Sequence, residues 1–451
     1  MVNSRWIKQI NTHFCGQMKK VLIVTYHWPP MGGGGVQRWL KTVKYLREFD
    51  WEPVIFTVTD AEISLPDHSL EEEIPEGVET LRVPIWEPFG LYKKITGKSS
   101  SEKVQPGLLS EGEGSNWRNE LALWIRGNVF IPDAKRFWIK PARKALIKYL
   151  KQNRVDAMVS TGPPHTTHMI ALAARKRTGT PWLADFRDPW TFVDYYDKLK
   201  LSRYADRRHH QLEAEVVNTA DKTITVTWSW AADFNRRNYE KEVEVITNGF
   251  DPADFPETPW PALSQKFVIT HIGSMNADRN PKALWPILDR LSQEWPEFAQ
   301  QLQIKLIGPV DGTILAAIRK SGLEDNLEHI KNLPHKEVIP HLQSSPLLLL
   351  PLNDTPNIAG VVPGKLFEYL AARRPILCIG KTDGDAAHIL RETGVGKVWH
   401  FSDEAGIEQS LREYWRDFQA GRLAAPEGAF QNYSRRKLAG DIAQALNAIS
   451  R

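Results

Sequence analysis

The sequence contains very little cysteine and no long apolar run. Only two cysteines occur among 451 residues, Cys15 and Cys378, which are too few and too far apart for a disulfide framework. No stretch of 18 apolar residues is present, so we expect no membrane-spanning helix. The composition therefore predicts a cytoplasmic protein, with the inner face of a membrane as the alternative location.

The chain also lacks a charge excess of either sign. Its 58 Lys and Arg residues against 54 Asp and Glu residues leave a formal net charge of +4, which offers no basis for a nucleic-acid partner. The first 17 residues lack the apolar core of a signal peptide, and Met18 directly precedes an apolar strand pattern. We therefore interpret residues 1–17 as a disordered or artefactual extension.

Strand and helix patterns alternate along the chain in two separate series. An apolar run at 21–25 predicts a buried strand, helical spacing follows over 36–49, and a second strand pattern covers 53–58. Such a βαβ unit requires a parallel sheet. A second series opens at 267–272, after the proline-rich segment 252–261. The pattern predicts an α/β fold of two doubly wound Rossmann-like domains that face a central cleft.

This pattern also sets the expected domain boundaries. We predict an N-terminal domain over 18–255 and a C-terminal domain over 262–430. The remaining residues, 431–451, have amphipathic helical spacing and could pack on either domain.

The first candidate site is the loop that contains Gly33 and Gly34, within a run of four glycines between a strand and a helix. Glycines at such a position let the backbone approach a ligand closely. The spacing does not match the dinucleotide fingerprint G-x-G-x-x-G, so it is poor evidence for NAD. A flexible turn is the alternative.

Two further candidate segments follow strands in the N-terminal half. His165 lies in a loop after the strand pattern 156–160, where an α/β sheet binds ligands, and could act as an acid or base. Asp185 and Asp188 flank Arg187 after another strand, and Asp188 is the better base candidate because it lies beyond the strand end. Simple packing of His165 and a structural ion pair of the aspartates are the alternatives.

The segment from Gly360 to Glu368 is the strongest candidate in the C-terminal half. Pro363 and Gly364 precede a helix pattern, and Lys365 adds a positive charge where a helix alone disfavours one. The misfit favours an anionic partner such as a diphosphate. Glu368 could accept two ribose hydroxyls. Ordinary helix capping is the alternative.

The loop after the first strand of the second series carries Gly273, Ser274, Arg279 and Lys282. The two cationic side chains could clamp a phosphate and so replace a metal ion, although solvated side chains are the alternative. Asp383-Gly384-Asp385 has the spacing of a metal-binding D-x-D motif, but it follows a late strand and is interpreted as a turn. We expect neither a metal nor a cofactor.

Taken together, the glycine-rich loop, the Asp185-Phe186-Arg187-Asp188-Pro189-Trp190 segment and the start of the 363–370 helix resemble family 4 glycosyltransferases of the GT-B fold. The resemblance implies retaining, metal-independent transfer from a nucleotide-diphosphate sugar. It further implies that the C-terminal domain binds the donor, the N-terminal domain binds the acceptor, and the last helix returns to the first domain.

The resemblance also implies roles for single residues. Glu368 matches the second Glu of the family's E-x₇-E motif, whereas Gly360 stands at the position of the first. Ser274 stands where relatives commonly have a phosphate-binding Arg, so Arg279 and Lys282 would supply that charge. His165 occupies the region of a catalytic-site His, and Gly33 and Gly34 would lie against the donor or acceptor. The leaving diphosphate would be stabilised by Arg279 and Lys365.

We therefore predict a glycosyltransferase of cell-surface polysaccharide or glycolipid synthesis, whose partners are a nucleotide sugar and a sugar or lipid-linked acceptor. A sugar-nucleotide epimerase and a non-catalytic sugar-nucleotide-binding protein are the alternatives. Segment 134–149 is basic and carries aromatic residues, which suits a peripheral membrane contact, although a solvated helix face fits equally.

Overall fold

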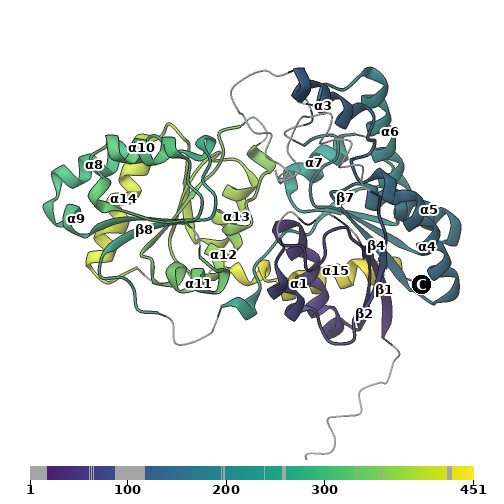
Figure 1. The fold of residues 1–451 in the computed structure, drawn as a ribbon. Coiled ribbons are helices and arrows are strands. Elements are labelled where there is room, and N and C mark those ends of the chain that lie inside the picture. Colours follow the sequence, from purple (N-terminus) through teal and green to yellow (C-terminus); the bar gives the residue numbers. More distant parts are fainter. Residues whose placement is uncertain are drawn as a thin grey trace, which may run out of the picture.

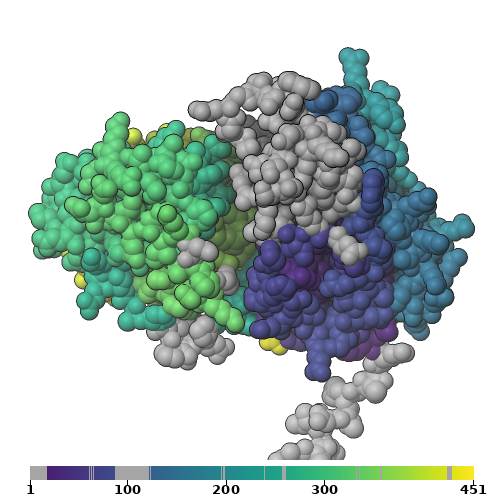
Figure 2. Space-filling view, viewed as in Figure 1, coloured from purple at the N-terminus to yellow at the C-terminus, as the bar shows by residue number. Residues whose placement is uncertain are grey.

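The computed structural model describes most of the chain as two lobes joined side by side (Figures 1 and 2). The described residues are 18–59, 61, 63, 66–86, 117–193, 196, 199–237, 239–255, 261–331, 333–355, 358–423 and 429–450. The predicted extension 1–17 lies outside them.

The N-terminal domain is built on a parallel sheet of seven strands in the order β3-β2-β1-β4-β5-β6-β7. The strands are β1 (Lys19–Val24), β2 (Trp51–Val58), β3 (Glu79–Val83), β4 (Ala157–Gly162), β5 (Trp182–Phe186), β6 (Lys222–Thr225) and β7 (Val243–Val245). Its helices are α1 (Gly34–Leu46), α3 (Trp117–Asn128), α4 (Ile139–Gln152), α5 (Thr166–Thr178), α6 (Arg203–Thr219) and α7 (Trp228–Arg236). Because the order turns back between β1 and β4, the sheet is doubly wound.

Val21 to Val24 of β1 are all buried, and successive residues point to opposite faces of the sheet. Leu22 and Val24 pack in the core under α4, α5 and α6, whereas Val21 and Ile23 pack under α1. A strand buried on both faces has no polar alternation, which explains its continuous apolar sequence.

The C-terminal domain has a parallel sheet of six strands in the order β10-β9-β8-β11-β12-β13. The strands are β8 (Phe267–Ile272), β9 (Leu302–Ile307), β10 (Leu327–Ile330), β11 (Leu347–Pro351), β12 (Ile376–Ile379) and β13 (Gly396–Trp399). Its helices are α8 (Leu284–Glu294), α9 (Pro296–Gln301), α10 (Gly312–Lys320), α11 (His335–Ser344), α12 (Lys365–Ala371), α13 (Asp385–Thr393) and α14 (Glu404–Gln419). The predicted α/β fold of two Rossmann-like domains is confirmed.

The last helix, α15 (Arg435–Ile449), belongs structurally to the N-terminal domain. Leu438 and Ile442 pack in the same core as Val36 and Leu40 of α1, and Figure 1 shows the yellow helix beside α1. Apolar side chains on one face of α15 thereby cover part of the first sheet.

The two domains meet through segments that follow the carboxyl ends of their strands. Trp228, Ser229 and Trp230, at the start of α7, contact the short 3₁₀ helix η8 (Ile358–Gly360) and the start of α13. Because α7 follows β6, while η8 and α13 follow β11 and β12, the carboxyl edges of the two sheets face each other.

The basic segment predicted as a helix over 134–149 starts later than expected. A 3₁₀ helix, η3 (Arg136–Trp138), leads into α4, which begins at Ile139 and runs to Gln152. Within the described ranges, no helix combines the length and apolarity needed to cross a bilayer.

Candidate active site

The structure brings Arg279 and Lys365 together at the carboxyl edge of the second sheet. Arg279 lies in the 3₁₀ helix η6 (Ala277–Arg279) after β8, and Lys365 is the first residue of α12. Both donate to the carbonyl oxygen of Ser274, from Arg279 Nη1 at 3.0 Å and from Lys365 Nζ at 3.4 Å. One backbone oxygen therefore holds two cationic side chains that are 86 residues apart in the sequence.

Neutral groups supply the other hydrogen bonds of these two cations. Arg279 Nε donates to Asn353 Oδ1 at 2.6 Å, and Lys365 Nζ lies 3.3 Å from His271 Nε2. Burial lowers the pKa of Lys365 to about 7, with Arg279 adding to the effect and Glu368 opposing it. Burial also lowers the pKa of Arg279. Two closely spaced cations held by neutral partners are the arrangement that a bound anion would stabilise.

Gly273 leaves room for the Lys365 amine. Its φ is +94°, a backbone conformation that favours glycine, and a Cβ built there would lie 3.1 Å from Lys365 Nζ. Three other predicted residues lie beside the two cations: Ser274 accepts from both, Gly364 directly precedes Lys365, and Glu368 is on the same helix. Ser274, Lys282 and Gly364 are exposed, and Glu368 is partly exposed one turn into α12. Since α12 has only seven residues, the positive character here comes from side chains rather than from a long helix dipole.

Gly360 lies at the contact between the domains. A Cβ at this position would come within 2.4 Å of Trp230 Nε1 and 2.6 Å of Trp230 Cδ1. Real Cβ contacts are never this short, so the indole of the N-terminal domain occupies the space that any larger residue would need. The backbone at position 360 therefore serves as a surface on which Trp230 packs.

The second aspartate of the Asp383-Gly384-Asp385 segment has a structural role that the sequence did not reveal. Asp385 is buried and accepts hydrogen bonds from Ser229 N at 3.0 Å and Ser229 Oγ at 3.1 Å. Beside it, the rings of Trp228 and His388 meet edge to face, with centroids 4.4 Å apart. In the part of the chain that the structure describes, no cluster of three or more His, Cys, Asp or Glu residues could hold a metal ion.

His165 is buried at the carboxyl edge of the first sheet, directly before α5. Its ring stacks on Trp190, with centroids 4.7 Å apart and an interplanar angle of 1°. Burial lowers the pKa of His165 well below the usual value, so the imidazole is neutral at pH 7. Its Nδ1 has no hydrogen-bond partner among the described residues. His165 is thus a neutral donor or acceptor.

His168 is fixed by the core. Its Nδ1 lies 2.7 Å from Ser160 Oγ, which also accepts from Trp182 Nε1 at 2.9 Å. The Ser160 hydroxyl can accept from the indole and still bond to His168 in either direction, and this contact holds the histidine as a packing residue.

Arg187 and His27 lie beside the glycine-rich loop and were not among the residues that the sequence suggested for ligand binding. Arg187 donates to the carbonyl oxygens of Gly35 and Pro163, and so links the glycine-rich loop to the loop before His165. Burial, with Arg187 and Lys135 nearby, lowers the pKa of His27 to about 3. A Cβ at Gly35 would lie 3.2 Å from the His27 ring. The glycines thus allow the loop to approach these side chains closely.

Gly33 and Gly34 lie on the open side of that loop. Gly33 has a φ of +89° and precedes α1, and a Cβ at either position would meet nothing within 4 Å among the described atoms. Asp188 is partly exposed beyond β5, and its charge opposes the burial-driven lowering of the pKa of Arg187.

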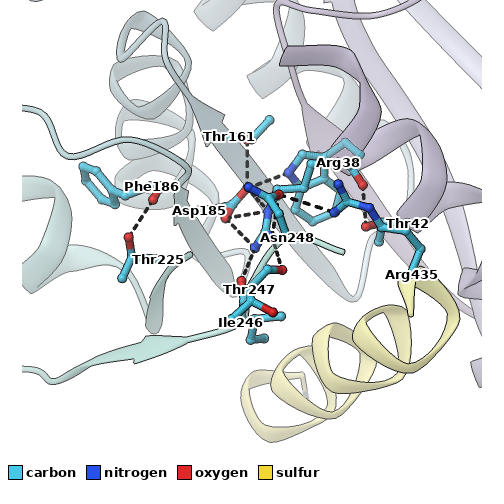
Figure 3. Close-up of polar contacts among 11 residues, drawn as sticks. Arg38, Thr42, Thr161, Asp185, Phe186, Thr225, Ile246, Thr247, Asn248 and Arg435 are labelled. Atoms are coloured by element: carbon cyan, nitrogen blue, oxygen red, sulfur yellow. Dashed lines mark hydrogen bonds and ion pairs between the residues drawn. The ribbon is translucent and has the colours of Figure 1, made fainter. Parts of the chain in front are cut away.

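Asp185 is a structural carboxylate rather than a surface group. Figure 3 shows it between Arg38 of α1 and Thr161 of β4. Arg38 donates to both carboxylate oxygens at 3.0–3.2 Å, and Trp39 Nε1 donates at 2.7 Å. Arg435 of α15 reaches the same cluster and approaches Asn248 Oδ1 at 3.4 Å. The network ties α1, the sheet and the last helix together.

A basic and aromatic surface lies at the start of α4. A cavity of about 530 Å³ is lined by Pro84, Ile85, Trp86, Arg136, Phe137, Lys140 and Pro141. Trp86 is 66% exposed, and its ring meets Phe137 edge to face with centroids 5.0 Å apart. Two cations beside exposed aromatic rings suit an amphipathic, negatively charged ligand or surface.

Two parallel Rossmann-like domains with facing carboxyl edges define a protein of the GT-B fold. Residues 33–249 match the family model described as "Glycosyl transferase 4-like domain". The predicted resemblance to family 4 glycosyltransferases is thereby confirmed, and the N-terminal domain is a glycosyltransferase domain of this type. No curated protein sequence matches the chain.

Solved structures of the same fold cover nearly the whole chain. HepE from Anabaena in complex with UDP has 13% identity and a TM-score of 0.59, covering 96% of this chain and 100% of that one. The N-terminal domain of trehalose-6-phosphate phosphatase from Candida albicans has 11% identity and a TM-score of 0.61, covering 96% and 97%. WaaG, a glycosyltransferase involved in lipopolysaccharide biosynthesis, has 15% identity and a TM-score of 0.50, covering 94% and 99%. At these identities the similarity establishes the fold alone.

Proposed function

We propose that this chain transfers a sugar from a nucleoside-diphosphate sugar to an acceptor hydroxyl, with retention of the anomeric configuration and without a metal ion. The observation that carries the proposal is the pair of Arg279 and Lys365, held by the Ser274 carbonyl and other neutral groups. Positively charged donors beside a departing diphosphate stabilise its developing charge, a role that a metal ion fills in other transferases. The UDP bound by HepE makes UDP the first ligand to test.

In this proposal the bond between the anomeric carbon and the diphosphate oxygen breaks, and the diphosphate leaves with the electron pair. The acceptor oxygen forms the new bond on the same face of the sugar, and its proton passes to the leaving phosphate. Arg279 and Lys365 stabilise the charge that develops on the diphosphate, and Lys282 adds to the positive field. Glu368 binds the ribose of the nucleotide.

The N-terminal domain supplies the acceptor side. The neutral imidazole of His165 and the ends of β4 and β5 lie at the carboxyl edge that faces the C-terminal domain. An unpartnered ring nitrogen in a buried position suits a hydrogen bond to a sugar hydroxyl. Asp188 and the loop at Gly33 and Gly34 complete this side.

Thermal unfolding with added ligand tests the donor site. A ligand that binds only the folded state raises the melting temperature, so UDP, GDP and ADP are compared with their nucleosides. We expect one diphosphate to stabilise the protein and the double variant Lys365→Met/Arg279→Met to lose that response. Arg319→Met removes an exposed cation that pairs with Glu324 on the same domain, and serves as the control. No response to any diphosphate would contradict the proposal.

Product analysis tests the reaction. With donor and acceptor present, we expect a product whose anomeric configuration equals that of the donor, at a rate that EDTA does not change. Conversion of the sugar nucleotide in the absence of any acceptor would instead identify an epimerase. Binding without either product would identify a non-catalytic protein.

We further propose that the acceptor belongs to polysaccharide or glycolipid synthesis, that it is lipid-linked, and that the protein works at the cytoplasmic face of a membrane. The exposed Trp86 and the cations Arg136 and Lys140 support this. We expect flotation with vesicles containing one quarter phosphatidylglycerol and not with pure phosphatidylcholine vesicles. Trp86→Ala/Lys140→Ala should abolish flotation, whereas Tyr204→Ala, which removes an aromatic residue 75% exposed on α6, should not. Equal flotation of all variants would exclude this surface.

A further inference from the structure

His271 is a buried polar side chain at the end of an apolar strand. It is the fifth residue of β8, its exposed fraction is 0%, and its neighbours in the strand are core residues. A histidine in such a position needs hydrogen-bond partners, because an unsatisfied buried imidazole is costly. Each of the two ring nitrogens has a hydrogen-bond partner.

The first partner favours one tautomer. His271 Nδ1 lies 3.0 Å from the carbonyl oxygen of Leu349 in the neighbouring strand β11, and the Tyr369 hydroxyl also approaches that oxygen at 3.4 Å. A carbonyl can only accept, so in the tautomer that donates to Leu349 the proton is on Nδ1 and Nε2 presents its lone pair to Lys365; the Ser274 carbonyl also approaches the ring. Burial and the nearby Lys365 and Arg279 lower the pKa of His271 well below the usual value, which keeps the ring neutral.

The second partner is the amine of Lys365, 3.3 Å from Nε2. The charged and polar groups that face this amine are the His271 ring, the Ser274 carbonyl, Arg279 and, from its own helix, Glu368. Two of the three ammonium hydrogens therefore have acceptors in the protein, the His271 ring and the Ser274 carbonyl. The third remains available for a ligand.

We propose that His271 is a positioning residue, whose imidazole holds the Lys365 amine in the orientation that binds the diphosphate. This proposal rests on the donor site proposed above. The imidazole suits this role because it accepts a hydrogen bond without adding a negative charge, whereas a carboxylate at the same place would neutralise the lysine and compete with the ligand.

Proton uptake on binding follows from the same geometry. Since the unliganded Lys365 has a pKa lowered to about 7, part of the population is uncharged at neutral pH. A diphosphate beside the amine favours the charged form, so at pH 7 the protein takes up a fraction of a proton for each diphosphate bound. Titration calorimetry in two buffers of different ionisation enthalpy measures that fraction directly.

Two substitutions separate the two ring nitrogens. The amide of His271→Asn reaches the position of Nδ1 and can still donate to Leu349, but leaves nothing near Lys365. The longer amide of His271→Gln reaches the position of Nε2 and can accept from the lysine. We expect the Asn variant to bind inorganic pyrophosphate and UDP about 10-fold more weakly, and the Gln variant to stay within about 3-fold of the wild type.

The matched control is His329→Gln. His329 lies on β10 of the same sheet, its Nε2 is 3.0 Å from the Gly308 carbonyl, and the lysine is not among its partners. This variant should bind pyrophosphate like the wild type. The melting temperature of each variant shows whether it folds. If His271→Asn does not fold, the binding measured for His271→Gln still tests the proposal.

Two reference variants complete the design. Lys365→Arg stays charged throughout, so we expect it to lose the extra proton uptake, and Lys365→Met should abolish pyrophosphate binding. If Lys365→Met binds poorly while His271→Asn binds with wild-type affinity and proton uptake, the positioning role of His271 is overturned and the donor site stands. If Lys365→Met binds like the wild type, the donor site itself is wrong.

Discussion

The indole of Trp230 packs directly on the backbone of Gly360, across the boundary between the two domains. The nearest indole atom lies 2.4 Å from the place where a Cβ of residue 360 would stand. A residue of the N-terminal domain thus determines which side chain the C-terminal domain can carry at this position. Asp385 and Ser229 reinforce the same contact.

Gly360→Ala should therefore destabilise the contact between the domains. Overpacking of a tight contact costs about 1–3 kcal/mol, because the indole or the backbone must move. Thermal unfolding measures the loss. Trp230→Ala removes the obstacle, so the double variant should lose less stability than the two single changes added together. Gly364→Ala is the control, since its Cβ would meet nothing within 4 Å among the described atoms. If the effects of Gly360→Ala and Trp230→Ala on stability are strictly additive, the two residues do not interact as described.

Asp185→Asn should lower the free energy of unfolding of the N-terminal domain. The change leaves the buried guanidinium of Arg38 without its counter-charge, which typically costs about 3–5 kcal/mol. We expect a lower denaturant midpoint in fluorescence-monitored unfolding. Asp383→Asn changes an exposed aspartate and should leave the midpoint unchanged. An unaltered midpoint in Asp185→Asn would show that the ion pair contributes little.

Lys365→Met should stabilise the unliganded protein near neutral pH. The folded protein holds this lysine with a pKa of about 7, against 10.5 for an ordinary lysine, so the unfolded chain binds more protons between these two values. Stability of the wild type therefore rises with pH across this window, and the cost of the buried charge is fully present below pH 7. We expect the variant to melt about 2–4 °C higher at pH 6.5, with the difference shrinking toward pH 10.

Lys336→Met provides the comparison for that measurement. Lys336 is an exposed lysine on α11, so its removal should change the melting temperature little at any pH. A variant at Lys365 that melts below the wild type at pH 6.5 would show that its hydrogen bonds outweigh the burial of its charge.

His165→Phe should slow transfer without weakening donor binding. The phenyl ring can keep the stacking on Trp190, but it removes both ring nitrogens. Loss of a positioned hydrogen-bonding or proton-transferring group typically lowers turnover about 10²-fold or more. Steady-state rates and pyrophosphate affinity are measured together. Unchanged turnover would reduce His165 to a packing residue.

The fold could be predicted from the sequence where strands are buried on both faces. Segments 21–25 and 267–272 are mostly apolar runs, and each became a central strand. The edge strands β3, β10 and β13 were missed. They are short, partly exposed and carry charged residues, as in Leu327–Ile330 and Gly396–Trp399, so they lack the apolar pattern.

The candidate site was only partly predictable. Arg279 and Lys365 were found because they follow a strand end and a Pro-Gly pair, which are local features. His271 was missed because it stands inside an apolar run, where a single histidine resembles a core residue. The contacts of Arg187 with Gly35 and of Trp230 with Gly360 were missed because each joins residues more than 100 positions apart.

The sequence by itself determined the two series of parallel strands, the glycine-rich loop and the clustering of charged residues at strand ends, since periodicity and chain order decide these locally. Only the tertiary structure decided that Asp185 pairs with Arg38, that α15 returns to the first sheet, and that Trp230 fills the space at Gly360. Those contacts join segments distant in sequence. Their formation depends on packing density and on the neutralisation of buried charge, which no local pattern records.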